Sequence, residues 1–266
     1  MPTSSPTPPG TALITGASSG IGAALAPLFA RDGWRLMLVA RSMAPMQDLA
    51  ERLTREHGGD VTVLTSDLAQ PNAAAELARE LESRGVVVDA LVNNAGFGVY
   101  GPYASTDAAT ESRMIAVNVV ALTELTKALL PGMLVRGRGR IMNLGSVGSF
   151  VPGPMMAVYY ATKAYVLSYS QALAAELEGT GVTVTAFCPG LTRTKFQSRA
   201  GLTLPRASQG PHVADVDAVA RAGYAAMMRG TRVAVPGLLN KIASQLPRVV
   251  PRDALARMIK RIQAAR

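Results

Sequence analysis

The sequence predicts an α/β protein in which helices cover both faces of one parallel β-sheet. Short apolar runs alternate with longer amphipathic segments along most of the chain. That alternation is typical of a parallel sheet with helical crossovers. The short runs are apolar throughout, as expected for strands that are buried on both faces. No change of composition before about residue 190 divides the 266 residues into smaller domains.

The expected strands are the apolar runs at 12–15, 35–40, 61–66, 89–95, 139–146, 182–188 and 232–235. The expected helices lie between them at about 22–32, 43–57, 72–84, 108–136, 157–178 and 215–229. Because crossovers between parallel strands are right-handed, this order gives a doubly wound, Rossmann-like sheet in three α/β/α layers.

Two segments flank the expected domain, which spans residues 11–235. Residues 1–10 are prolines and small residues, and we expect a disordered lead segment there. Residues 236–266 form a basic, amphipathic C-terminal extension. Inside the domain, the polar stretch 191–214 follows a strand at the edge of the sheet where ligands bind. We expect a substrate loop there, either a mobile cover or only a long connection.

Cysteine, histidine and hydrophobic patterns exclude several classes of protein. Cys188 is the one cysteine and lies in an apolar run, so we expect a buried side chain and no disulfide. His57 and His212 are far apart, and no metal site is expected. The first residues lack the pattern of a secretory signal, and no uninterrupted apolar stretch approaches the roughly 20 residues of a spanning helix. We therefore expect a cytoplasmic protein.

The net charge of +9 is concentrated at the C-terminus. From Thr231 onward the chain has eight basic residues and one acidic residue, Asp253. The rest is close to neutral, which argues against a nucleic-acid-binding surface. A basic amphipathic extension can lie on an anionic membrane. We favour packing against the body or a neighbouring subunit, because most apolar helical stripes face a core.

A glycine-rich turn, TGASSGIG at residues 15–22, follows the first strand and opens the first helix. Glycines at this place allow a tight turn and let a diphosphate approach the amides at the helix N-terminus. The motif therefore predicts a dinucleotide site. The residues expected to contact the cofactor here are Gly16, Ser18, Ser19, Gly20, Ile21 and Gly22.

The end of the second strand indicates which dinucleotide is bound. An NAD site usually has an acidic residue there for the ribose 2′-hydroxyl, and residues 39–42 contain none. Arg41 instead offers a cation for a 2′-phosphate, with the hydroxyls of Ser18 and Ser19 within reach. We therefore favour NADP(H) over NAD(H) as the cofactor.

Polar residues also follow the third and fourth strands. Asp67 and Leu68 come after the third strand, and Asp67 is suited to accept a hydrogen bond from an adenine amino group. Asn94, Ala95 and Gly96 follow the fourth strand at the same edge. Asn94 either contacts the cofactor or ties neighbouring strands together through its amide, and the sequence leaves both open.

Ser146, Tyr159 and Lys163 form the candidate catalytic group. Tyr159 and Lys163 are four residues apart in a helical pattern, so they project from one face. A free phenol has a pKa near 10. A neighbouring ammonium and the positive ring of an oxidised nicotinamide favour the phenolate and lower that pKa. Ser146 is placed to hydrogen-bond a substrate oxygen, and Tyr160 is assigned to packing or substrate contact.

With these motifs the chain resembles a short-chain dehydrogenase/reductase of the single-domain type, from about residue 11 to 235. The resemblance implies that Asn118 holds a water that links Lys163 to solvent, and that Lys163 also binds the nicotinamide ribose. It implies that Pro189, Gly190 and Thr192 hold the nicotinamide carboxamide. It also implies a homodimer or homotetramer packed through the helices at 108–136 and 157–178.

The expected function is NADPH-dependent hydride transfer between the cofactor and a carbonyl or secondary alcohol carbon, with Tyr159 exchanging the proton. The alternatives are NAD-linked alcohol oxidation and a non-catalytic regulator that senses NADP. The residues expected to line the substrate pocket are apolar, which suits an apolar or 3-oxoacyl-type ketone. They are Phe97, Val99, Tyr100, Pro152, Met155, Met156, Leu191 and Phe196.

Overall fold

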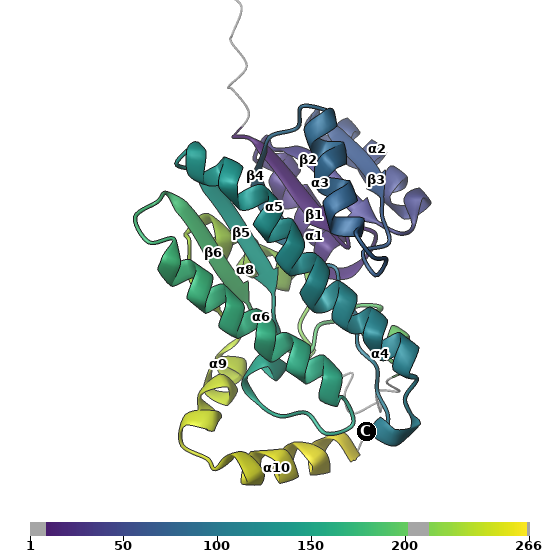
Figure 1. The fold of residues 1–266 in the computed structure, drawn as a ribbon, viewed down its shortest axis with the longest axis vertical. Coiled ribbons are helices and arrows are strands. Elements are labelled where there is room, and N and C mark those ends of the chain that lie inside the picture. The colour runs from purple at the N-terminus through teal and green to yellow at the C-terminus, as the bar shows by residue number, and fades with distance from the viewer. Residues whose placement is uncertain (1–8, 202–212, 265–266) are drawn as a thin grey trace, which may run out of the picture.

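The computed structural model describes residues 9–201 and 213–264. In these ranges seven parallel strands form one sheet with the order β3-β2-β1-β4-β5-β6-β7 (Figure 1). The predicted doubly wound fold is confirmed. The strands are β1 (Thr11–Thr15), β2 (Arg35–Ala40), β3 (Val61–Thr65), β4 (Val88–Asn93), β5 (Gly139–Leu144), β6 (Val182–Phe187) and β7 (Val233–Ala234).

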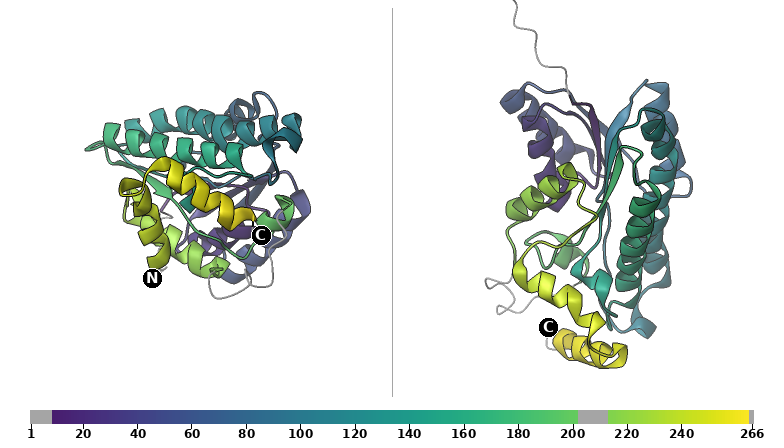
Figure 2. Two further views of the ribbon diagram at one scale, coloured as in Figure 1. Left: turned by 90° about the horizontal axis from the view of Figure 1, so that it is seen from below. Right: turned by 90° about the vertical axis from the view of Figure 1, so that its left-hand side faces the viewer.

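Helices cover both faces of the sheet (Figure 2). One face carries α1 (Gly20–Arg31), α2 (Met43–His57) and α8 (Val216–Met228). The other carries α3 (Ala73–Ser83), α5 (Leu122–Val135) and α6 (Ala157–Glu176). The remaining helices are α4 (Ala108–Ile115), α7 (Phe196–Arg199), α9 (Leu238–Gln245) and α10 (Arg252–Ala264), with short 3₁₀ turns at Tyr103–Ser105, Val147–Phe150 and Leu246–Arg248.

An aromatic cluster anchors α8 against α1 on the first face. The ring of Phe29 meets the rings of Trp34 and Tyr224 edge-on, with centroids 5.6 and 4.8 Å apart. The Tyr224 hydroxyl donates to Asp32 at 2.6 Å, so its polar end also has a partner. Burying each such ring contributes roughly 1.5–3 kcal/mol. These contacts hold α8, the helix that follows the substrate loop, against α1 at the start of the domain.

The long helix predicted at 108–136 contains a wide turn. A π-helical segment, Ala116–Ala121, joins α4 to α5 and carries Asn118. Such turns are frequent at functional sites. By length and composition Ala108–Val135 is the one helix among the described residues that could span a membrane, with 33% of its apolar stretch buried. Core helices of soluble proteins meet the same test, so this assigns no membrane span.

The C-terminal extension forms two helices on the side of the sheet where β5 and β6 end (Figures 1 and 2). Leu255 of α10 is fully buried, and the α9 residue Asn240 lies against Gly190, which follows β6. Most of the predicted lead segment and residues 202–212 of the predicted substrate loop lie outside the described residues.

The turn between α6 and β6 contains two glycines whose surroundings differ. Gly181 has φ +81°, and an added Cβ would collide with the carbonyl oxygen of Gly137. Gly179 has φ +80° with open space around its Cβ position. We expect Gly181→Ala to lower the free energy of unfolding by about 3 kcal/mol or more, because strain and collision add. Gly179→Ala should cost about 1 kcal/mol, from strain alone.

Urea unfolding followed by circular dichroism measures both losses. Equal losses for the two variants would contradict the assigned collision with Gly137.

Candidate active site

A cavity of about 350 Å³ lies at the carboxyl ends of the strands. Its walls come from the segments that follow β1 to β6, so the fold brings together residues from Gly16 to Arg199. Ser146 and all the predicted cofactor residues except Gly22 line it. Those lining residues are Gly16, Ser18, Ser19, Gly20, Ile21, Arg41, Asp67, Leu68, Asn94, Ala95, Gly96, Tyr159, Lys163, Pro189, Gly190 and Thr192.

Asn94 determines the shape of the glycine-rich turn. Its side-chain amide donates to the carbonyl oxygens of Thr15 at 2.8 Å and Gly16 at 3.2 Å. The same amide fills the space where a Cβ at Gly16 or Gly22 would lie, and Gly16 has φ +68°. Glycine is therefore required at both positions, and the structure supports the strand-tying role for Asn94. Gly22 contributes by this close approach, outside the cavity wall.

Four cations line the cavity, and one of them, Arg199, lies at the glycine-rich turn. Arg41, Lys163, Lys195 and Arg199 line it, and Asp67 is the one acidic residue among the lining residues. Ser19 is the N-cap of α1, but its hydroxyl makes no capping hydrogen bond and instead accepts one from Arg199 at 3.4 Å. The free amides of a helix N-terminus and neighbouring cations both favour an anion. The chemistry of this end therefore suits the phosphates of a dinucleotide.

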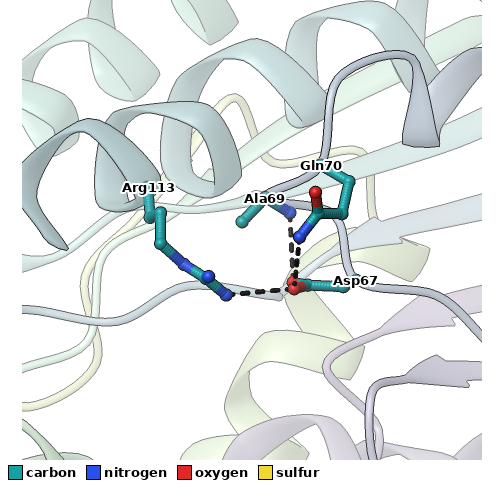
Figure 3. Close-up of polar contacts among 4 residues, drawn as sticks. All are labelled: Asp67, Ala69, Gln70 and Arg113. Carbon is teal, nitrogen blue, oxygen red and sulfur yellow. Dashed lines mark hydrogen bonds and ion pairs between the residues drawn. The ribbon is translucent and has the colours of Figure 1, made fainter. Parts of the chain in front are cut away.

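Asp67 is held as a carboxylate by its neighbours (Figure 3). Burial opposes its ionisation, but hydrogen bonds from Gln70 and the backbone of Ala69, with the charges of Arg113 and Arg41, hold its pKa below the usual value. Arg113 donates to it at 3.0 Å. The side chain lies at the predicted edge and keeps its capacity to accept further hydrogen bonds.

Ser146 is oriented by a short 3₁₀ turn after β5. Its hydroxyl accepts from the amide of Gly148 at 3.0 Å, while its own amide donates to the hydroxyl of Ser149 at 3.1 Å. This reciprocal arrangement is a capping box, which fixes the serine rotamer. The serine hydroxyl therefore faces the cavity from a defined position.

Lys163 is buried and anchored to the end of β5. Its ammonium donates to the carbonyl oxygen of Leu144 at 2.6 Å, and burial lowers its pKa to about 8. One residue earlier, Thr162 accepts a hydrogen bond from Asn118, whose amide also pairs with both backbone groups of Phe97. Asn118 lies outside the cavity, and it connects the loop after β4 to α6. Its predicted water contact is untested and stays a prediction.

Tyr159 lies between Ser146 and Lys163 on the cavity wall. Burial raises the pKa of its phenol, and a hydrogen bond with Ser146 offsets only part of that effect. The Lys163 ammonium lies 5.8 Å from the centre of the tyrosine ring. Burial therefore dominates the pKa of this phenol. The predicted lowering also depends on the positive ring of an oxidised nicotinamide, and it stays a prediction. A protonated phenol is the form that can donate a proton.

The apolar end of the cavity is built around Tyr159 from α6 and α7. The ring of Phe196 lies 5.3 Å from that of Tyr159, and the ring of Tyr160 lies at 5.9 Å. Four of the eight residues predicted for the substrate pocket line this cavity, namely Phe97, Met156, Leu191 and Phe196. Tyr100 packs on the same cluster without lining the cavity.

Sequence reasoning missed four cavity residues on and before α7. They are Thr194, Lys195, Gln197 and Arg199, and Thr194 packs against the Cβ position of Gly20. The substrate loop was predicted as a unit, without roles for its basic residues. Their signal in the sequence was the presence of cations in a loop at the ligand-binding edge of the sheet.

The sequence profile of the short chain dehydrogenase family matches residues 10–204. The chain belongs to this family. Its sequence is 39% identical over 186 residues to sulfoacetaldehyde reductase 2 of Chromohalobacter salexigens, an alignment that covers 69% of this chain and 73% of the relative. The predicted family and the predicted enzyme class, an oxidoreductase that acts on CH–OH and C=O groups with NAD or NADP, are confirmed.

Two solved structures of short-chain dehydrogenases align with nearly the whole chain. A short-chain dehydrogenase from Sphingobium yanoikuyae in complex with NADPH has 37% identity and a TM-score of 0.80, covering 92% of this chain and 97% of that one. The bulky-bulky ketone specific alcohol dehydrogenase from Comamonas testosteroni has 36% identity and a TM-score of 0.77, covering 92% and 96%. The sheet and its flanking layers are therefore those of the family.

The assigned role of Asn94 predicts an effect on stability without any cofactor. We expect Asn94→Ala to lower the free energy of unfolding by about 2 kcal/mol, because two carbonyl oxygens lose a hydrogen-bond donor. Asn94→Asp keeps the size but removes the donor, and it should lose at least as much. Thermal and urea unfolding of the cofactor-free protein measure this. Unchanged stability of both variants would assign Asn94 to cofactor contact instead.

Proposed function

We propose that this short-chain dehydrogenase uses NADPH to reduce a bulky, apolar ketone. One observation carries the proposal. Ser146, Tyr159 and Lys163 line the same cavity as the glycine-rich turn and the cations around it. The proposed proton donor and the proposed site for the phosphates of a dinucleotide therefore face the same cavity.

The protein's contribution to the reaction is to orient the reactants and transfer a proton. The bound nicotinamide would supply hydride chemistry. Ser146 is held by its capping box so that its hydroxyl can bind the carbonyl oxygen of the substrate. Tyr159 donates its phenolic proton to that oxygen as negative charge develops there. Lys163 supplies a fixed donor beside the tyrosine.

The choice of NADP rests on charge at the ribose end of the cavity. Arg41 lines the cavity after β2, where no acidic residue is available to bind a ribose 2′-hydroxyl. Its planar guanidinium suits a 2′-phosphate. Arg199 approaches Ser19 at the N-terminus of α1, which suits the diphosphate that NADP and NAD share. The similar structure from Sphingobium yanoikuyae is a complex with NADPH.

The substrate class follows from the apolar end of the cavity. Phe97, Met156, Leu191 and Phe196 offer aromatic and flexible side chains next to Tyr159. The similar enzyme from Comamonas testosteroni is specific for bulky-bulky ketones. An aryl or steroid-like ketone therefore fits better than a small, charged aldehyde, and a 3-oxoacyl thioester belongs in the same substrate panel.

A homo-oligomer through α4, α5 and α6 is part of the proposal. Ile115 of α4, Val120 of the π-helical segment before α5 and Tyr165 of α6 are 40–44% exposed. Tyr165 and Tyr169 stack with ring centroids 5.8 Å apart, giving this surface a flat aromatic patch. Exposed apolar side chains of this kind favour subunit contact.

Cofactor titration tests the assignments of Arg41 and Arg199. We expect Arg41→Ala to raise the Kd of NADPH about tenfold and to leave that of NADH nearly unchanged, because it loses the contact with the 2′-phosphate. Arg199→Ala should raise both values about tenfold, because both cofactors share the diphosphate. Fluorescence titration of each variant with each cofactor measures this.

Arg193→Ala is the matched control, since Arg193 is an exposed arginine of the same segment that does not line the cavity. Equal affinity of the unchanged protein for NADPH and NADH would remove the NADP assignment. An Arg199→Ala loss restricted to NADPH would move Arg199 to the 2′-phosphate.

Turnover of the ketone panel tests the reaction itself. We expect Tyr159→Phe to lower kcat about 1000-fold while the Kd of NADPH stays within about twofold, because only the proton donor is removed. Loss of NADPH absorbance measures kcat. Tyr103→Phe, which changes an exposed tyrosine, is the control. NADPH binding with no turnover of any carbonyl by the unchanged protein would favour the non-catalytic regulator instead.

A further inference from the structure

Helix α9 is amphipathic, but it turns its apolar side to solvent. Leu238, Leu239 and Ile242 are 74%, 73% and 56% exposed. Their spacing places them on one face of the helix. The opposite side is polar and faces the body, where Ser244 is buried and Asn240 lies against Gly190. A surface helix of a globular protein normally has the reverse orientation.

The polar side chains of α9 hydrogen-bond within their own segment, and Asn240 also reaches the body. The Asn240 amide donates to the carbonyl oxygen of Pro236 at 2.8 Å, and the Ser244 hydroxyl donates to that of Lys241 at 2.7 Å. Gly190 has no side chain, and the Asn240 side chain occupies the position where its Cβ would lie. The polar face of α9 therefore packs closely against the body. Packing against the body does not explain why the helix also has an apolar face.

The apolar face belongs to a larger surface that is strongly basic. Val249 is 80% exposed and Met258 39% exposed on the segment after α9. Exposed basic side chains accompany them, and Asp253 is the one acidic residue among the described residues of the extension. Those basic residues are Lys241, Arg248, Arg257, Lys260 and Arg261. We call these ten exposed apolar and basic residues, from Leu238 to Arg261, the extension surface.

We propose that the extension surface docks on an anionic lipid bilayer. Exposed leucine and isoleucine side chains flanked by lysine and arginine are the combination that inserts at a lipid interface and is attracted to anionic headgroups. A second copy of this chain fits less well. Self-contact across a two-fold axis would place this basic surface against itself, and like charges repel.

The position of the extension surface gives docking a consequence for catalysis. The extension lies on the side of the sheet where β5 and β6 end (Figure 1). The residues that line the cavity follow the ends of the strands at that same edge. Through Asn240 and Gly190, α9 contacts the cavity wall directly. If the proposed function holds, docking would bring the apolar end of the cavity close to a bilayer that dissolves apolar ketones.

Vesicle co-sedimentation of the full chain tests docking without any activity measurement. The probes are vesicles of phosphatidylcholine with phosphatidylglycerol, and vesicles of phosphatidylcholine alone. We expect binding to the anionic vesicles that weakens with salt, and little binding to the neutral ones. The double change Leu238→Asp with Leu239→Asp should weaken binding about tenfold or more, because two inserting side chains are lost.

The double change Met43→Asp with Val87→Asp is the matched control, because both side chains are exposed outside the extension, at 46% and 49%. It should bind anionic vesicles as the unchanged protein does. For the basic side chains, Lys241→Glu should weaken binding more than Arg229→Glu, which changes an exposed arginine after α8. Circular dichroism establishes that each variant is folded.

Two results would overturn the proposal. One is absence of binding to anionic vesicles by the unchanged protein, and the other is equal binding by the double aspartate variant. Light scattering then identifies the other occupant. An oligomer that dissociates on Leu238→Asp with Leu239→Asp, and binds no vesicles, would make the extension surface a subunit interface. Neither result bears on NADPH turnover, so the proposed function is tested separately.

Discussion

The hydrogen bonds of the Asn94 amide are the constraint on which the site depends. They join the loop after β4 to the turn after β1, at the point where the order of the sheet reverses direction. A doubly wound sheet opens its ligand crevice at that point. The Asn94 amide fills the space beside Gly16 and Gly22, and the turn can pass close to it because these glycines have no side chains. Helix α1 then begins at the cavity. The diphosphate end and the β4 loop therefore share one anchor.

Lys163 imposes the second constraint, since burying an ammonium is unfavourable without partners. The carbonyl oxygen of Leu144 supplies one partner, and burial still lowers the pKa of the lysine to about 8. The wide turn at Ala116–Ala121 places Asn118 where it bonds Phe97 and Thr162, next to this lysine. The irregular helix thus connects the loop after β4 to α6, the helix that carries Tyr159 and Lys163.

Periodicity and motif order were sufficient to predict the sheet, because strands buried on both faces must be apolar along their whole length. Most cavity residues of the glycine-rich turn and the following strand ends were predictable, because the carboxyl ends of parallel strands meet at one edge. The cavity residues on and before α7 were not, because they lie in a long loop without a regular pattern. The π turn at Asn118 was not predictable, because its residues keep the composition of an ordinary helix. The raised pKa of Tyr159 was not predictable either, because it depends on burial by residues that are distant in the sequence.

The orientation of α9 shows a further limit of pattern analysis. A hydrophobic stripe on a helix predicts that one face is buried but does not say against what. Here the contact of Asn240 with Gly190 turns the polar face inward. The sequence also concentrates its positive charge in this segment while the body stays near neutral. Stability of the domain does not explain this concentration of charge, because the extension exposes leucines and brings like charges together. A negatively charged, apolar partner at the cavity side of the sheet would satisfy both features at once.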